Sequence, residues 1–204
     1  MFRKNLLLVI SGPSAAGKGT ICQALLRKNP ESIQCSVSAT SRDVRPGEQE
    51  GLTYYYLGQD QFRSRIDKGE FLEHAEVYGN YYGTLKSEVN RLFELNNDVI
   101  LEIEMQGAMQ IREKTNDAVL IFIMPPSFKE LRQRILNRKR DSKEDIEERL
   151  QKVKDELKYM ADYDYIVVND TIENAVKKIE AIIVAEKCRF DKKRLDIDGF
   201  LSDI

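Results

Sequence analysis

The stretch LLLVISGPSAAGKGT, residues 6–20, joins an apolar run to a glycine-bounded loop that ends in a lysine. A pattern typical of a helix, with its apolar side chains on one side, follows over residues 21–26. The loop satisfies G-x-x-x-x-G-K through Gly12, Gly17 and Lys18. Backbone N–H groups of such a loop and of the helix N-terminus favour an anion, and the lysine adds a full positive charge. The stretch therefore predicts a phosphate site, with an ordinary glycine turn as the alternative.

The residues that follow the lysine depart from the usual pattern. A serine or threonine commonly stands directly after it and contributes a hydroxyl to Mg²⁺. Here Gly19 occupies that position, and Thr20 comes one residue later. Thr20 is therefore the nearest candidate for a hydroxyl ligand, although the phosphates and water could hold the metal instead.

The composition predicts one soluble globular domain with a substantial core. The chain has 204 residues, of which 42% are hydrophobic and 32% charged, and its formal net charge is −2. This balance lacks the basic excess of a nucleic-acid-binding protein, so we expect no nucleic-acid partner. No apolar run approaches the ~20 residues that span a bilayer, and we expect no membrane span. Arg3 and Lys4 precede an apolar run that is too short for a signal peptide.

The cysteines and the histidine restrict both the compartment and the chemistry. Cys22, Cys35 and Cys188 are odd in number and lack the spacing of metal ligands, which favours a reducing cytoplasm. His74 is the sole histidine of the chain. A mechanism that needs a histidine pair or a histidine-based triad is therefore not expected.

Strand-like and helix-like patterns alternate along most of the chain. Apolar runs typical of buried strands occur at residues 6–10, 99–104, 118–124 and 165–168. The alternation predicts an α/β fold in which helices cover both faces of a mainly parallel central sheet. A tyrosine-rich segment at about residues 33–90 interrupts this rhythm, and within it residues 33–38 alternate like a half-buried strand. We therefore expect this segment to be inserted into a core formed by residues 1–32 and 91–190.

Two groups of basic residues are candidates for phosphate binding. Arg42 and Arg45 lie three residues apart in a polar loop, and arginine forks suit phosphate oxygens. The second group gathers five basic residues within nine, namely Arg132, Arg134, Arg138, Lys139 and Arg140. Without further context, a solvated surface is the favoured interpretation of both groups.

Several other stretches of the sequence match a known family of enzymes, and they suggest a role for these basic residues. Over about residues 4–190 the chain resembles guanylate kinases, which belong to the nucleoside monophosphate kinase class. The resemblance rests on SATSR at 38–42, RPGE at 45–48, GLTY at 51–54, EFLEH at 70–74, GNYYGT at 79–84, EIEMQG at 102–107 and YDYIVVND at 163–170. So many matches in order are far more specific than the loop alone.

The resemblance implies a fold and a reaction. The fold would be a three-layer P-loop kinase core with an inserted GMP-binding subdomain and an arginine-rich lid at about residues 134–149. The enzyme would move the γ-phosphoryl group of ATP directly and in line to GMP or dGMP, with Mg²⁺ bound to ATP. By position, the catalytic residues would be Lys18, Arg42, Arg134, Arg138 and Arg149.

The resemblance also implies the nucleotide contacts. ATP would be bound by Ser14, Ala15, Ala16, Gly17, Lys18, Gly19 and Thr20, with Asn169 near the adenine. The GMP phosphate would be held by Arg42, Arg45, Tyr54 and Tyr82, and the base would face Ser38, Glu73, Thr84 and Glu104. Guanine offers N1–H and N2–H₂ as adjacent donors to a carboxylate, whereas adenine presents an acceptor at N1. A buried carboxylate would therefore reject adenine strongly.

Three further departures from the family pattern affect these assignments. The family usually has aspartates where this chain has Glu102 and Glu104, and glycine where it has Ala15. Glu102 would orient Mg²⁺ through water, and the additional methylene changes its reach.

Two alternatives remain at this stage. Scaffold proteins contain non-catalytic guanylate-kinase-like modules that bind peptides, but such modules typically lack the phosphate loop. A related kinase could act on another mononucleotide or on a phosphorylated ribose. The expected partners are small nucleotides, and the chain would act as a monomer or a homo-oligomer.

Overall fold

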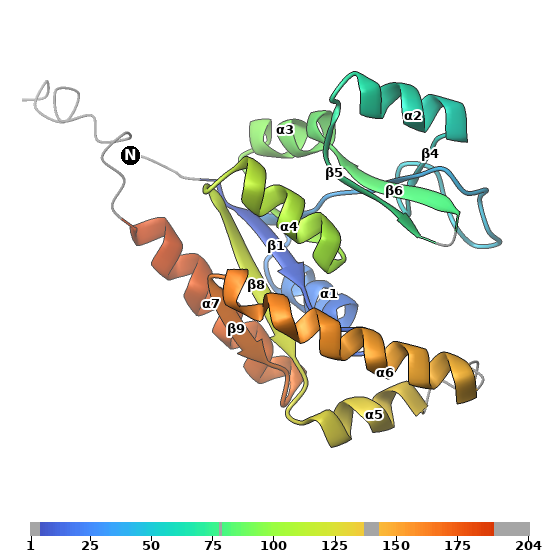
Figure 1. Cartoon of the computed structure of the whole chain (residues 1–204). Helices are drawn as coiled ribbons and strands as arrows, with labels where there is room; N and C mark the ends of the chain where they lie inside the picture. Colours follow the sequence, from blue (N-terminus) through green and yellow to red (C-terminus); the bar gives the residue numbers. More distant parts are fainter. Residues whose placement is uncertain (1–4, 78, 137–142, 190–204) are drawn as a thin grey trace, which may run out of the picture.

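The larger of two sheets contains the apolar runs of the sequence as parallel strands (Figure 1). Its order is β2-β7-β1-β8-β9, with β1 at Leu7–Ser11, β2 at Ile33–Cys35, β7 at Asp98–Glu102, β8 at Ala118–Met124 and β9 at Tyr165–Val168. The computed structural model describes residues 5–77, 79–136 and 143–189 of the chain. Strand β8 is buried at every position but its last, because helices cover both faces of the sheet. The predicted mainly parallel α/β fold is confirmed.

Helices on the two sides of this sheet produce two hydrophobic clusters. Helices α1 (Lys18–Lys28) and α7 (Ile172–Cys188) pack against one face, and α3 (Lys86–Glu94) and α4 (Met105–Lys114) pack against the other. Neighbouring residues of β1 enter opposite clusters, as the period of two in a strand requires. The sheet is thus the middle of three layers.

The second sheet is small and lies to one side of the first (Figure 1). It has the order β4-β3-β6-β5, with β3 at Ala39–Thr40, β4 at Tyr55–Tyr56, β5 at Phe71–Val77 and β6 at Asn80–Leu85. Strands β5 and β6 form an antiparallel hairpin, and helix α2 (Gln59–Asp67) covers one face. We call this unit, residues 39–85, the small subdomain.

The start of the small subdomain differs from the simple expectation for residues 33–38. Instead of one half-buried strand, these residues form β2 and then leave the sheet. Strand β2 pairs in parallel with β7, so it belongs to the larger sheet. Helix α3 likewise packs its buried Val89 and Leu92 against that sheet. The insertion expected at about residues 33–90 therefore corresponds to a small sheet that runs over residues 39–85.

Helices α5 (Phe128–Leu136) and α6 (Lys143–Leu157) pack against each other through Leu131, Ile135 and Val153. The short 3₁₀ helix η1 (Lys158–Asp162) follows α6. Ser127 caps the start of α5, because its hydroxyl accepts a hydrogen bond from the N–H of Glu130 at 3.1 Å.

Part of the lid expected at residues 134–149 lies outside the described residues. Arg138 is among residues 137–142, and the side chain of Arg149 is not described either. Within the described ranges, no helix has the length and apolar character needed to cross a membrane.

Phe62 of α2 should be the main hydrophobic contact of the small subdomain. Its side chain is fully buried and its ring stacks on Phe71, with 4.4 Å between the ring centroids. Phe62→Ala should lower the free energy of unfolding by about 3–5 kcal/mol, because a large cavity remains in a small core. Urea denaturation measures this, and the exposed neighbour Gln61 provides the control as Gln61→Ala. Equal effects of the two substitutions would contradict the assignment.

Candidate active site

The loop of residues 12–17 lies between β1 and α1 and requires unusual backbone angles. Gly12 has φ 141° and Gly17 has φ 97°, in a range that favours glycine. A Cβ at Gly12 would collide with the carbonyl oxygen of Ile123 in β8, so the loop can lie this close to β8 only with glycine there. Ala15 also has a positive φ of 65°, where the family usually has glycine. A side chain is therefore accommodated there at a cost in backbone strain.

Lys18 begins α1 and turns back over this loop. Its ammonium donates hydrogen bonds to the carbonyl oxygens of Gly12 at 2.5 Å and Pro13 at 3.4 Å. The charge thus lies beside the loop and within reach of the adjoining cavity, which Lys18 also lines.

Asn169 fastens the loop to the end of β9. Its side-chain amide is buried and donates to the carbonyl oxygen of Ala16 at 2.8 Å. A Cβ at Gly17 would collide with this amide nitrogen. The carbonyl oxygen of Asn169 in turn accepts from Arg134 of α5 at 3.4 Å. The side chain expected near the adenine is therefore bound to the phosphate loop, and its backbone links that loop to α5.

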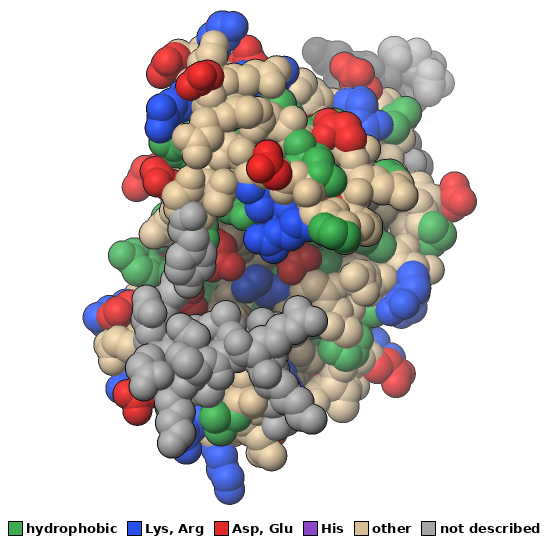
Figure 2. Space-filling model, turned by 90° about the vertical axis from the view of Figure 1, so that its right-hand side faces the viewer, with side chains coloured by type: hydrophobic (Ala, Val, Ile, Leu, Met, Phe, Trp, Pro, Cys, Tyr) green, Lys and Arg blue, Asp and Glu red, His purple; other side chains and the backbone are tan. Residues whose placement is uncertain are grey.

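A cavity of 340 Å³ lies between the loop and the small subdomain. Figure 2 shows a face of the molecule that is hollowed between its upper and lower parts, with basic and acidic side chains in the hollow. Of the residues expected to bind nucleotides or metal, the cavity is lined by Lys18, Ser38, Tyr54, Glu73, Tyr82, Glu102 and Glu104. These residues come from three separate parts of the chain, and the fold brings them together.

Glu73 is the most deeply buried acid of this cavity. Its side chain is 4% exposed, and Oε1 accepts a hydrogen bond from the hydroxyl of Thr84 at 2.7 Å. Burial raises the pKa of Glu73 above its usual value, although the hydrogen bonds from Thr84 act in the opposite direction. A Cβ at Gly107 of α4 would collide with Oε2. The carboxylate is therefore fixed in place by its neighbours on both sides.

Glu102 ends β7 and faces the first turn of α1. A Cβ at Gly19 would lie 3.2 Å from Oε1 of Glu102, which is closer than most carbon–oxygen contacts of this kind. The carboxylate of Glu102 therefore lies tightly against the position that a side chain at residue 19 would take. Burial raises the pKa of Glu102, nearby Lys18 lowers it, and Glu104 raises it again.

The surroundings of Glu102 fit a magnesium ion that is held mainly by phosphates and water. A carboxylate beside the phosphate loop supplies the hard oxygen that Mg²⁺ prefers. The described residues contain no group of three or more histidine, cysteine or acidic side chains that could hold a metal by themselves. Thr20, the other candidate ligand, is exposed.

Arg42 is held by a residue that sequence reasoning missed. Its guanidinium forms two hydrogen bonds with the carboxylate of Glu48, at 2.6 and 2.7 Å, and lies 5.0 Å from the ring centroid of Tyr54. Tyr56 donates to the same carboxylate at 2.8 Å. The hydrogen bonds from Arg42 lower the pKa of Glu48 to about 2. Glu48 belongs to the quoted RPGE stretch, but a sequence pattern does not show that it would pair with Arg42.

The remaining arginines differ in their positions. Arg45 is exposed, and its backbone N–H donates to Glu48 at 2.9 Å. Arg134 forms an ion pair with Glu130, one helical turn away, at 3.2 Å. Neither side chain lines the 340 Å³ cavity.

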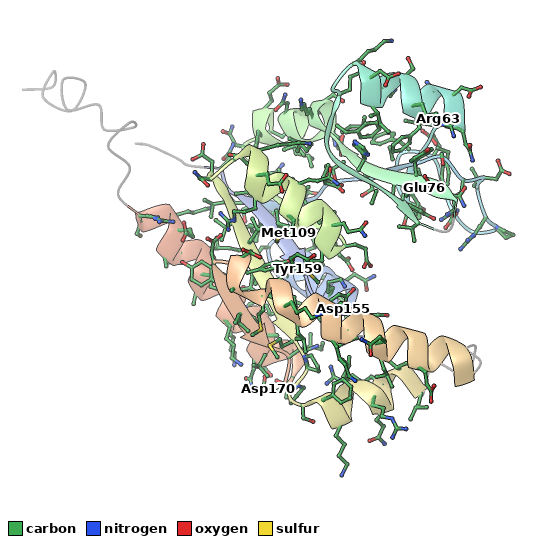
Figure 3. The ribbon with its side chains drawn as sticks, in the orientation of Figure 1. Arg63, Glu76, Met109, Asp155, Tyr159 and Asp170 are labelled. Carbon is green, nitrogen blue, oxygen red and sulfur yellow. The ribbon has the colours of Figure 1, made fainter. Side chains whose placement is uncertain are left out.

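A second cavity of 730 Å³ adjoins the first, and Glu104 lines both. It lies between β5, α4, α6 and η1. Figure 3 shows four of the lining residues, with Glu76 on β5, Met109 on α4, Asp155 on α6 and Tyr159 on η1. The opening between the small subdomain and the rest of the protein therefore has an acidic margin.

The fold and the cavity together define a class. A phosphate loop at the end of a parallel strand faces a small sheet with a buried acid, as in P-loop kinases of nucleoside monophosphates. The family model for guanylate kinase matches residues 4–186. The chain belongs to the guanylate kinase family.

Individual relatives agree with this assignment. The chain is 53% identical to a guanylate kinase of Clostridium perfringens over 93% of its own length and 87% of the relative. It is 51% identical to one of Desulfitobacterium hafniense over 96% of this chain and 97% of the relative. Among solved structures, the guanylate kinase of Anaplasma phagocytophilum has a TM-score of 0.73 at 34% identity, covering 93% of this chain and 89% of that one.

The buried acid should make the stability of the protein depend on pH. Because the pKa of Glu73 is raised in the folded state, the free energy of unfolding falls as the pH rises from the unfolded pKa through the folded one. Glu73→Gln removes the buried charge and keeps an acceptor for Thr84. Its stability gain over the wild type should therefore grow with pH, as measured by urea unfolding between pH 4 and 8. Glu76→Gln, at an exposed position of the same strand, is the control, and a gain independent of pH would contradict the burial cost.

Proposed function

We propose that the chain catalyses the transfer of the γ-phosphoryl group of ATP to GMP, which gives ADP and GDP, and that dGMP serves as an alternative acceptor. The observation that carries this proposal is the position of Glu73. Its buried, hydrogen-bonded carboxylate lines the same cavity as Lys18 of the phosphate loop. One end of the cavity thus suits a guanine edge, and the other suits a phosphate chain.

The base would be recognised by the acids and hydroxyls of the cavity. The carboxylate of Glu73 can accept from the guanine N1–H and N2–H₂ together. Thr84 orients this carboxylate, and Ser38 and Glu104 line the same space. An adenine in this position would direct an acceptor at a buried acid, which is strongly unfavourable.

The acceptor phosphate would be bound by the aromatic and basic residues of the small subdomain. Tyr54 and Tyr82 line the cavity, and the Arg42 guanidinium lies against the ring of Tyr54. Arg45 would add a second positive charge from its exposed position. Glu48 keeps the fork of Arg42 in one orientation before the substrate arrives, which lowers the entropic cost of binding.

The donor would be bound by residues 14–20, with Lys18 on the phosphate oxygens. Asn169 supports this loop through the carbonyl of Ala16. Arg134, Arg138 and Arg149 would approach the transferring group from the lid at residues 134–149. Mg²⁺ would neutralise charge on the phosphates of ATP, with Glu102 holding its waters and Thr20 as a further candidate ligand.

The reaction needs alignment and charge neutralisation and no covalent intermediate. An oxygen of the GMP phosphate forms a bond to the γ-phosphorus as the bond from that phosphorus to the β,γ-bridging oxygen breaks. Lys18 and the arginines stabilise the charge that spreads over the transferring group. The domain division supports this, because the larger sheet presents the donor and the small subdomain presents the acceptor.

Two further observations support catalytic activity and the expected cellular compartment. The phosphate loop and relatives named guanylate kinase at 45–53% identity favour the enzyme over an interaction module. Cys22, Cys35 and Cys188 are free thiols, which supports action in a reducing cytoplasm. The proposed reaction would in turn assign the chain to purine nucleotide metabolism.

Substrate choice provides the first test. ADP formation from ATP and Mg²⁺ should depend on GMP or dGMP, with little turnover of AMP, CMP or UMP. Glu73→Gln should raise KM for GMP and reduce the GMP-over-AMP preference on the order of 100-fold, because the mismatched edge can no longer be excluded by a buried charge. Absence of GMP-dependent turnover would disprove the kinase assignment. An unchanged preference in the variant would disprove only the role of Glu73.

Loss of the loop lysine should affect the chemical step. Lys18→Met should lower kcat on the order of 10³-fold, because a charge beside the transferring phosphoryl group is removed. Lys28→Met, on the same helix but paired with Glu180 at the surface, is the matched control. Steady-state kinetics at saturating GMP measure both. A similar small effect of the two substitutions would contradict the role of Lys18.

A further inference from the structure

Strand β5, which contains Glu73, lies at the edge of the small sheet. One side of its backbone pairs with β6, and the other side has no neighbouring strand among the residues that the structure describes. An edge strand presents N–H and C=O groups that need other partners. Helix α4 of the larger sheet lies along this side, so the edge meets the rest of the protein there.

Gln110 of α4 pairs with the free backbone edge at His74. Its side-chain N–H₂ donates to the carbonyl oxygen of His74 at 2.7 Å, and its side-chain oxygen accepts from the N–H of His74 at 3.1 Å. The amide thus replaces the peptide unit of a neighbouring strand. Both bonds fall on the residue directly after Glu73.

Lys114, one helical turn further along α4, makes a similar contact on the other side of Glu73. Its ammonium donates to the carbonyl oxygen of Leu72 at 2.7 Å. The register of β5 against β6 shifts between Phe71 and Glu73, which leaves an irregular strand at this point. Helix α4 therefore holds the backbone on both sides of Glu73 where the sheet holds it least regularly.

Helix α4 also positions the second acid of the base cavity. Glu104 is the residue immediately before the first turn of α4. Gly107, on the same helix, leaves the space that the Glu73 carboxylate occupies. Glu73 and Glu104, the two acids expected to face the base, are thus both positioned by one helix, although Glu73 belongs to the small subdomain.

We propose that Gln110 is a positioning residue for guanine recognition, which fixes the Glu73 carboxylate relative to Glu104 by pairing with the backbone of His74. The inference rests on the proposed function and deepens it. It assigns a part in base selectivity to Gln110, which does not line the 340 Å³ cavity but pairs with the residue that follows Glu73. The helix-to-strand contact, and not the small sheet alone, then determines the spacing of the two acids.

Gln110→Met tests the proposal, because methionine has a similar length and helix propensity but cannot form either bond. KM for GMP should rise about tenfold, and the GMP-over-AMP ratio of kcat/KM should fall by about the same factor, as expected when partly buried backbone groups lose their partners. KM for ATP should change less than about twofold. The control is Gln59→Met, which removes an exposed glutamine bond to Gly79 of the same hairpin.

Gln110→Glu provides a second variant of the same shape, in which a carboxylate oxygen faces the His74 carbonyl and the donor is lost. A reduced GMP-over-AMP ratio in both Gln110 variants, with the ratio of Gln59→Met unchanged, would support the proposal. Equal losses of GMP and AMP turnover in both Gln110 variants would overturn it, because that pattern indicates general loosening. A wild-type chain that turns over no GMP would overturn the proposed function, and this inference with it.

Discussion

The burial of a single carboxylate is the constraint on which the cavity depends. A side chain as buried as that of Glu73 loses the hydration of its charge, so its oxygens need fixed partners. Thr84 supplies one partner, and Gly107 allows the helix to approach without a colliding side chain. In the proposed function, a ligand with two adjacent donors would satisfy this carboxylate, and a ligand with an acceptor there would not.

The two sheets contribute different parts of the cavity. The larger sheet presents the phosphate loop at the carboxyl end of β1, where the helix N-terminus favours anions. The small subdomain presents Tyr54 and Tyr82 to the cavity, and the guanidinium of Arg42 lies beside the ring of Tyr54. Helix α4, which packs against the larger sheet, contacts the edge strand β5 through Gln110 and Lys114, so it contributes to the spacing of the two parts of the cavity.

The sequence predicted the features that follow from local patterns. The loop of residues 12–17 and the buried run of β8 both follow from patterns within a few residues. The pairing of Glu48 with Arg42 and of Asn169 with Ala16 could not be predicted, because side-chain contacts depend on how the loops fold. The strand expected at residues 33–38 ended early for a similar reason. Its alternation continues beyond Cys35, but the pairing with β7 ends with the hydrogen bond from the N–H of Ser36 to the carbonyl oxygen of Ile100.

Gly19 and Glu102 are two unusual residues, and each limits the side chains that the other position can accept. A Cβ at position 19 would lie 3.2 Å from Oε1 of Glu102, so a side chain introduced there first would require the carboxylate to shift by a few tenths of an ångström. Shortening Glu102 to aspartate first would withdraw that oxygen and make the later change easier. We therefore expect the two positions to be epistatic, because the effect of a side chain at position 19 depends on the length of the acid at position 102.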